Sequence, residues 1–176
     1  METLKLDIAT SYNNNDTEIK VCINCVDDTC NISDIIKTHN DGSFKECLAS
    51  VILRISKGKK YIVMNDFYNN ALKAGRGMSY VSEKLRGGIY AMLCILLNTA
   101  INKGLINEND DVYLPIKIDI KDDLKEENLY DRVVEYYNML GFTLMGNKMG
   151  GRAGQILNVC ENREVSKELK NILKNI

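Results

Sequence analysis

The chain has 176 residues, of which 45% are hydrophobic and 27% are charged, so its composition is that of an ordinary globular protein rather than a disordered or collagen-like one. This length suits one core, and we expect a single domain over residues 1–176. A formal net charge of -1 gives no general attraction for a polyanion, so no nucleic-acid partner is expected.

The N-terminus lacks the basic stretch and apolar run of a signal peptide. The longest apolar stretch, Ile89 to Leu97, is far shorter than the roughly 20 residues that cross a bilayer. We therefore expect a cytoplasmic protein with no membrane partner, and cysteines in the reduced state.

A cysteine cluster with C-x2-C-x4-C spacing comprises Cys22, Cys25 and Cys30. It can supply part of a zinc site, with His39 or Cys47 as the fourth ligand. The alternation of apolar and polar residues over 19–25 instead indicates an ordinary strand in which cysteines act as small core residues. We favour the strand and expect no metal.

The first half of the chain predicts mainly strands. Strands are expected over roughly 3–9 and 18–26 around the polar turn 11–16, followed by a helix over 32–37. A hairpin is expected from 48–55 and 61–64, because two β-rich runs flank the polar turn 56–59. Residues 65–79 carry few apolar side chains and predict a loop or an irregular strand.

The second half alternates helices and strands. A buried helix is predicted over 89–101, then a strand over 112–120 whose Pro115 indicates an edge or a splay in the sheet. A helix over 124–140 follows. The remaining elements predicted are strands 142–145 and 155–160 around the loop 146–154, and a C-terminal helix with an apolar stripe on Val165, Leu169, Ile172, Leu173 and Ile176.

The segment from Val81 to Leu93 reads VSEKLRGGIYAML. It is similar to the coenzyme A signature of the GNAT superfamily of N-acetyltransferases, Val-x-Pro-x-x-Arg-Gly-x-Gly-Ile-Gly-x-x-Leu. One residue is missing between Arg86 and Ile89, no proline follows Val81, and Tyr90 replaces the last small residue. Glycines before a helix let backbone N–H groups approach an anion such as a pyrophosphate. A simple strand-to-helix turn also needs glycine for its backbone angles.

A second segment, Tyr130 to Phe142, is similar to the family pattern Asn-x-x-Ala-x-x-x-Tyr-x-x-x-Gly-Phe. Its end, Tyr137-x-x-x-Gly141-Phe142, matches fully, whereas Tyr130 and Val133 stand where the family prefers asparagine and alanine. The resemblance covers about residues 45 to 160. It implies a GNAT-like acyl-CoA N-acyltransferase fold, an α/β (α+β) architecture in which a central mixed, mostly antiparallel sheet is flanked by helices.

The resemblance implies direct acetyl transfer, in which an amine attacks the thioester of acetyl-CoA held in a splay between two parallel strands. Here these would be the strands around Tyr80-Val81 and over 112–120. Tyr137 would protonate the leaving thiolate, and Tyr136 serves as its control. The residues implied in cofactor binding are Tyr80, Val81, Arg86, Gly87, Gly88, Ile89 and Tyr90.

The general base is expected to be Glu83, with Asp66 and Glu46 as alternatives, although a solvated surface carboxylate is the commoner role for each of these residues. The acceptor is a small amine, a polyamine or a protein amine, and loop 146–154 with Lys148 and Arg152 falls where the family shapes its acceptor pocket.

Two other interpretations stay open, a degenerate GNAT-like domain that acts as an interaction module and a zinc module on an unrelated core. The apolar stripe of the C-terminal helix leaves a homodimer as a further expectation.

Overall fold

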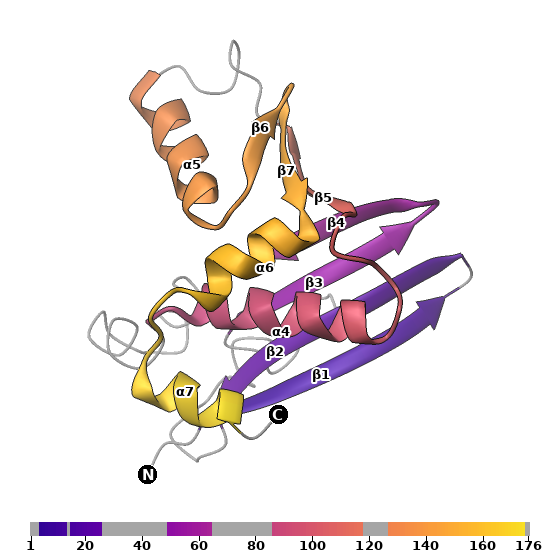
Figure 1. Cartoon of the computed structure of the whole chain (residues 1–176), viewed down its shortest axis with the longest axis vertical. Coiled ribbons are helices and arrows are strands. Elements are labelled where there is room, and N and C mark those ends of the chain that lie inside the picture. The colour runs from indigo at the N-terminus through magenta and orange to yellow at the C-terminus, as the bar shows by residue number, and fades with distance from the viewer. Residues whose placement is uncertain (1–3, 14, 26–48, 65–85, 118–126, 175–176) are drawn as a thin grey trace, which may run out of the picture.

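The computed structural model describes residues 4–13, 15–25, 49–64, 86–117 and 127–174. This part of the chain is mixed α/β, with a mostly antiparallel sheet and helices packed against it (Figure 1). The sheet has seven strands in the order β1-β2-β3-β4-β5-β7-β6. The mixed, mostly antiparallel sheet that the sequence predicted is therefore confirmed.

The first four strands form a continuous antiparallel meander. They are β1 Leu4–Asn13, β2 Asp16–Cys25, β3 Ala49–Ser56 and β4 Lys59–Met64. The first pair is longer than predicted, because Asn13 pairs with Asp16 and the strands continue into the expected turn. The predicted hairpin between β3 and β4 is confirmed, and its turn residues Lys57 and Gly58 both have positive φ values, 51° and 77°. Two such residues fit a two-residue hairpin loop that follows the twist of the strands.

The second half of the sheet begins with β5 Asp111–Lys117. It contacts β4 in parallel and is antiparallel to β7 Lys148–Arg152, which in turn pairs with the edge strand β6 Thr143–Met145. The register between β5 and β7 shifts between Tyr113 and Lys117, around Pro115. Pro115 therefore lies at an irregularity inside the sheet and not at its edge, since proline cannot donate a ladder hydrogen bond.

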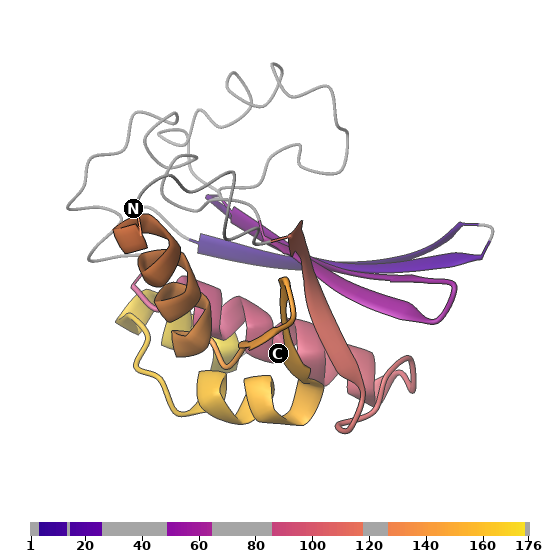
Figure 2. The same ribbon diagram turned by 90° about the horizontal axis from the view of Figure 1, so that it is seen from above.

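The described helices are α4 Gly88–Asn102, α5 Glu127–Met139, α6 Ala153–Glu161 and α7 Lys167–Lys174. Helices α4, α6 and α7 lie on one side of the sheet, with α4 across β2 and β3 and α7 beside β1 (Figure 2). Helix α5 lies against β6. None of the helices in the described ranges combines the length and the apolarity needed to cross a bilayer.

The core lies between the meander and α4. Ile19, Leu53 and Ile62 are successive cross-strand partners, so their side chains share the face toward α4, and all three are fully buried. Helix α4 fills this face with a nearly all-apolar sequence. Its large, fully buried side chains are Met92, Leu93, Leu96 and Leu97.

The prediction for residues 146–160 was wrong. The expected loop 146–154 is a tight turn followed by β7, and the expected strand 155–160 is helix α6. The residues of α6 that are buried follow helical spacing and are Ala153, Ile156, Leu157 and Cys160. The sequence carried this i, i+3, i+4, i+7 pattern, but the β-branched content of the short run obscured it.

The remaining predictions concern the C-terminal helix, the helix 32–37 and the segment 65–79. The apolar stripe of the C-terminal helix is confirmed, with Val165 and Leu169 buried and Ile172 and Leu173 packed on the core. The predicted helix 32–37 and the segment 65–79 lie outside the described residues.

Burial on α4 gives a direct test of the core. Leu96→Ala should lower the free energy of unfolding by about 2–5 kcal/mol, because it removes buried methyl groups and leaves a cavity. Asn98→Ala, on the exposed side of the same helix, should change it by less than about 0.5 kcal/mol. Urea denaturation of both variants measures the difference, and equal losses would contradict this packing of α4.

Candidate functional site

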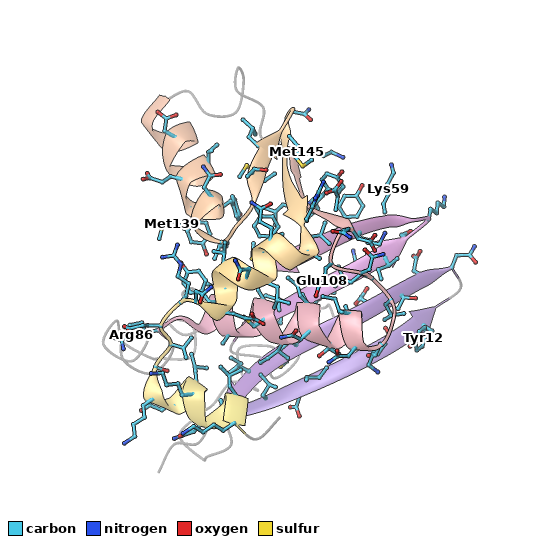
Figure 3. The ribbon with its side chains drawn as sticks, in the orientation of Figure 1. Tyr12, Lys59, Arg86, Glu108, Met139 and Met145 are labelled. Carbon is cyan, nitrogen blue, oxygen red and sulfur yellow. The ribbon has the colours of Figure 1, made fainter. Side chains whose placement is uncertain are left out.

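The glycine turn that precedes α4 is the first part of the candidate site. Gly87 is the N-cap of α4 and has a left-handed backbone, with φ 76° and ψ 9°. Its carbonyl accepts a hydrogen bond from the Ala91 N–H at 3.1 Å, which begins the helix. No side chain of the described residues caps the helix, and its first turn holds no acidic residue. The Arg86 side chain is exposed at this end of α4 (Figure 3).

The segment 160–166, which comprises the last two residues of α6 and the link to α7 and is called the strap below, packs directly on this turn. The Ser166 N–H donates a hydrogen bond of 2.8 Å to the Arg86 carbonyl. A Cβ atom on Gly87 would lie only 2.4 Å from the Glu164 carbonyl oxygen and 2.8 Å from the Val165 Cα. Gly87 therefore meets two demands, a positive φ and the close approach of another backbone.

The strap also reaches α5. The Arg163 guanidinium lies 5.5 Å from the centre of the Tyr90 ring and donates a hydrogen bond of 3.4 Å to the Met139 carbonyl. The Cys160 thiol donates to the Leu140 carbonyl at 3.7 Å. The strap thus connects the start of α4 to the end of α5. Sequence reasoning missed it, because backbone carbonyls make most of these contacts and leave no pattern in the residue types.

Tyr137 lies near the end of α5, half-buried against the core. Its ring contacts Phe142 edge-on, with ring centres 6.4 Å apart. Burial raises the pKa of the Tyr137 phenol above its ordinary value. The adjacent Tyr136 is 50% exposed. The two tyrosines therefore occupy different environments on the same helix, with Tyr137 on the inner side.

The Gly-Phe pair after Tyr137 has a packing role. The Tyr137 carbonyl accepts hydrogen bonds of 3.1 Å from the N–H groups of Leu140 and Phe142, and Gly141 between them has φ 96°. This left-handed glycine ends the helix. A Cβ on Gly141 would lie 3.0 Å from the Ile156 Cα of α6, and Phe142 is fully buried. The motif that resembles the family therefore also fixes α5 against the core.

The junction of β4 and β5 is the third part of the site. Among the described residues their parallel pairing consists of one residue pair, Tyr61 and Tyr113. The described residues beyond it, 62–64 and 114–117, do not continue this ladder. The two tyrosine rings lie 6.5 Å apart, and the Lys148 ammonium is 5.8 Å from the Tyr61 ring centre.

Several predicted site residues lie outside the described ranges, namely Glu46, Asp66, Tyr80, Val81 and Glu83. The sequence placed the parallel partner of β5 around Tyr80-Val81, whereas the partner that the structure describes is β4. Two basic residues were expected in the acceptor loop. The Lys148 ammonium lies over the ring of Tyr61, and Arg152 lines a cleft beside α6. The structure does not bring these two side chains together.

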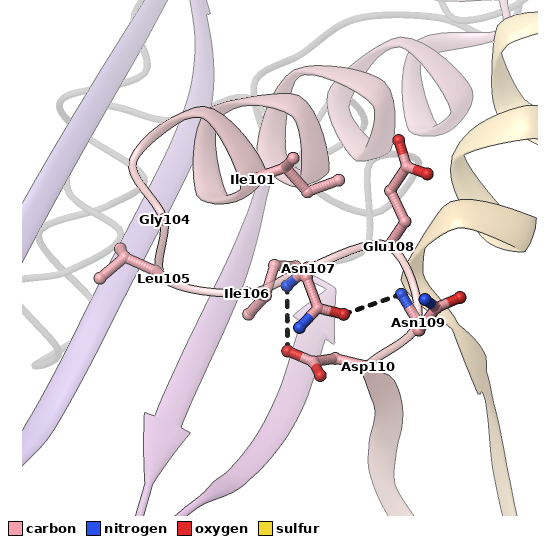
Figure 4. Close-up of a pocket in the computed structure, with 8 residues that line it drawn as sticks. All are labelled: Ile101, Gly104, Leu105, Ile106, Asn107, Glu108, Asn109 and Asp110. Carbon is pink, nitrogen blue, oxygen red and sulfur yellow. Dashed lines mark hydrogen bonds between the residues drawn. The ribbon is translucent and has the colours of Figure 1, made fainter.

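Two cavities lie at the opposite end of α4 from the glycine turn. One, of about 650 Å³, is formed by Ile101 and the loop 104–110 (Figure 4). Hydrogen bonds of 3.0 Å from the Asn107 N–H to Asp110 and from the Asn109 N–H to Asn107 hold this loop. The other, of about 590 Å³, lies between α4 and α6 around Glu108 and Arg152. Their exposed polar linings mark them as surface hollows beside a rigid loop, and neither touches Arg86, Gly87 or Tyr137.

The structure assigns a state to three cysteines, which are of two kinds. Cys22 on β2 is disulfide-bonded, so the expectation of reduced thiols was wrong for this residue, and it is not available as a zinc ligand. Within the described ranges no group of three His, Cys, Asp or Glu side chains is placed to hold a metal ion. Cys94 and Cys160 are free thiols.

Comparison with known proteins found no matching family model, no similar curated protein and no similar solved structure.

The two demands on Gly87 can be separated by experiment. Gly104→Ala introduces a side chain at φ 71° into open space, and we expect it to cost about 1–2 kcal/mol of stability. Gly87→Ala at φ 76° also meets the strap and should cost a further 1–3 kcal/mol or so. Thermal and urea denaturation give both values. Equal losses of stability in the two variants would mean that the strap moves aside easily and that its packing does not require glycine at position 87.

Proposed function

We propose that the chain is an acetyl-CoA-dependent N-acetyltransferase that transfers the acetyl group directly to a primary amine. The observation that carries this proposal is the junction of β4 and β5. Parallel pairing stops after Tyr61 and Tyr113, and Pro115 and the register shift fall on the next residues of β5. This arrangement supports a splay between two parallel strands, the feature in which proteins of the resembling family hold the thioester.

The glycine turn offers suitable chemistry for the pyrophosphate of this substrate. The start of α4 has no acidic residue and no side-chain cap among the described residues, so its first N–H groups and the helix dipole favour an anion. The exposed Arg86 can add a charge-assisted hydrogen bond. The strap takes one side of Gly87 and Gly88 is buried, whereas Ile89 and Tyr90 are partly exposed, so we propose that the anion approaches Gly88 from the side of Ile89 and Tyr90.

The chemistry proposed for Tyr137 follows from its protonation state. The amine nitrogen attacks the thioester carbonyl carbon, the C–S bond breaks as the tetrahedral intermediate collapses, and the thiolate takes a proton. Because burial raises the pKa of Tyr137, its phenol stays protonated at neutral pH and can donate that proton. Holding the two reactants together would supply much of the acceleration.

The general base and the amine acceptor complete the proposed reaction. Glu83 remains our candidate base, and a small amine, a polyamine or a protein amine remains the acceptor. Tyr61, Tyr113 and Lys148 gather at the β4–β5 junction on the sheet face away from α4, since Tyr61 neighbours the core residue Ile62 along β4 and so points the other way. We propose that this face receives the acceptor.

A second candidate is a GNAT-like domain that acts as an interaction module without catalysis. The specific observation in its favour is that the chain's own strap occupies one side of the glycine turn. The Glu164 carbonyl lies against Gly87, and Arg163 lies over the ring of Tyr90, the residue that replaces a small one in the family signature. Binding of acetyl-CoA distinguishes the two candidates.

Calorimetric titration with acetyl-CoA is the first test. We expect the wild-type chain to bind, and Arg86→Glu to weaken binding by about tenfold or more, because it replaces a charge-assisted bond with repulsion of the pyrophosphate. Lys103→Glu is the matched control, since it makes the same charge change at the exposed C-terminal end of α4 and should change affinity less than about twofold. A folded wild type that does not bind would favour the interaction module.

The role of Tyr137 predicts a specific kinetic result. Tyr137→Phe should lower kcat by about 100-fold or more in an assay of coenzyme A release with a panel of primary amines, whereas Tyr136→Phe should have little effect. The acid works only while protonated, so the step should persist through neutral pH. It should fail only as pH rises through the raised pKa of Tyr137, above 10.0. Unchanged kcat in Tyr137→Phe would remove this residue from the mechanism.

A further inference from the structure

The two free thiols of the described chain contact each other. Cys94 lies on α4 and Cys160 on α6, two helices that pack against each other, and the Cys94 thiol is near enough to raise the pKa of Cys160. The contact between Tyr90 and Arg163 lies beside them on the same two segments. Residues 90 and 94 are one turn apart on α4, so both contacts belong to a single seam between α4 and the strap end of α6.

The two thiols differ in access to solvent. Cys94 is partly exposed, whereas Cys160 is 2% exposed and donates a hydrogen bond to the Leu140 carbonyl. The nearby Cys94 thiol, together with burial, raises the pKa of Cys160, and neighbouring Glu161 raises it further while Arg163 opposes the shift. An oxidant in solution therefore reacts first with Cys94, and the buried Cys160 is the second thiol of the pair.

We infer that Cys94 and Cys160 form a redox-sensitive pair that closes to a disulfide and locks α4 to the strap. The oxidant is hydrogen peroxide. The Cys94 thiolate attacks one peroxide oxygen, the O–O bond breaks, and water leaves after proton uptake, which gives a sulfenic acid. The Cys160 sulfur then attacks the Cys94 sulfur, its proton passes to the departing hydroxide, and a second water leaves.

The lock would act on the strap, which contacts the glycine turn and the end of α5. A covalent bond between residues 94 and 160 restricts the unfolded chain and fixes this junction. Reduction by a dithiol would release it. This device does not depend on the proposed acetyltransferase activity, because it can be read from cysteine chemistry and stability alone.

Peptide mapping of the full chain tests the pair. Trypsin places Cys94 in peptide 87–103 and Cys160 in peptide 153–163, each with one cysteine. After treatment with hydrogen peroxide we expect a linked peptide pair that has lost two hydrogen atoms and that dithiothreitol separates. Oxidation should also raise the Tm by about 5 °C or more.

Cys94→Ala is the control variant, because it removes the accessible thiol from a partly exposed position. It should give no linked pair and no peroxide-dependent rise in Tm. Peptide mapping of the wild type needs no variant. It therefore shows whether Cys94 and Cys160 form a disulfide even if Cys94→Ala fails to fold. Sulfinic acid on Cys94 without a linked pair would overturn the inference, as would two thiols that survive peroxide while a small alkylating reagent modifies Cys94.

Discussion

The packing of the strap on the glycine turn is the constraint on which the rest of the site depends. Ser166 hydrogen-bonds to the Arg86 carbonyl, and the backbone of Glu164 fits against Gly87 only because glycine has no Cβ. Arg163 and Cys160 extend the same contact to the end of α5. The start of α4 and the end of α5, which are distant in the sequence, therefore both contact the strap. These contacts set the position of Tyr137 relative to α4.

The same packing limits what the turn can do. A glycine pair before a buried helix suits an anion, yet one side of Gly87 already belongs to the strap. Gly88, the next residue, is itself buried, so little of the turn's backbone next to the strap is open to solvent. The proposed anion site and the observed packing thus involve the same turn, which is why substitution of a glycine alone does not distinguish a structural role from a binding role.

The two ends of helix α4 have different surroundings. At its start lie the glycine turn, the strap and the end of α5, while its C-terminal end leads through a hydrogen-bonded loop to β5. Two surface hollows lie beside this loop, but their exposed polar linings offer little apolar surface to enclose a ligand. At the β4–β5 junction the parallel ladder of the described residues consists of the single pair Tyr61 and Tyr113, which is the feature on which the proposed function rests.

The sequence by itself determined the periodic elements and the turn residues. Alternation predicted strands in the first half, a polar glycine turn predicted the β3–β4 hairpin, and continuous apolarity predicted the buried α4, since each signal comes from residues close together in the chain. It also singled out Arg86, Gly87 and Tyr137. Tertiary structure alone decided that 155–160 is helical, that β4 is the described parallel partner of β5, and that the strap closes over Gly87. Those outcomes depend on contacts between backbone groups far apart in sequence, which residue types do not encode one position at a time.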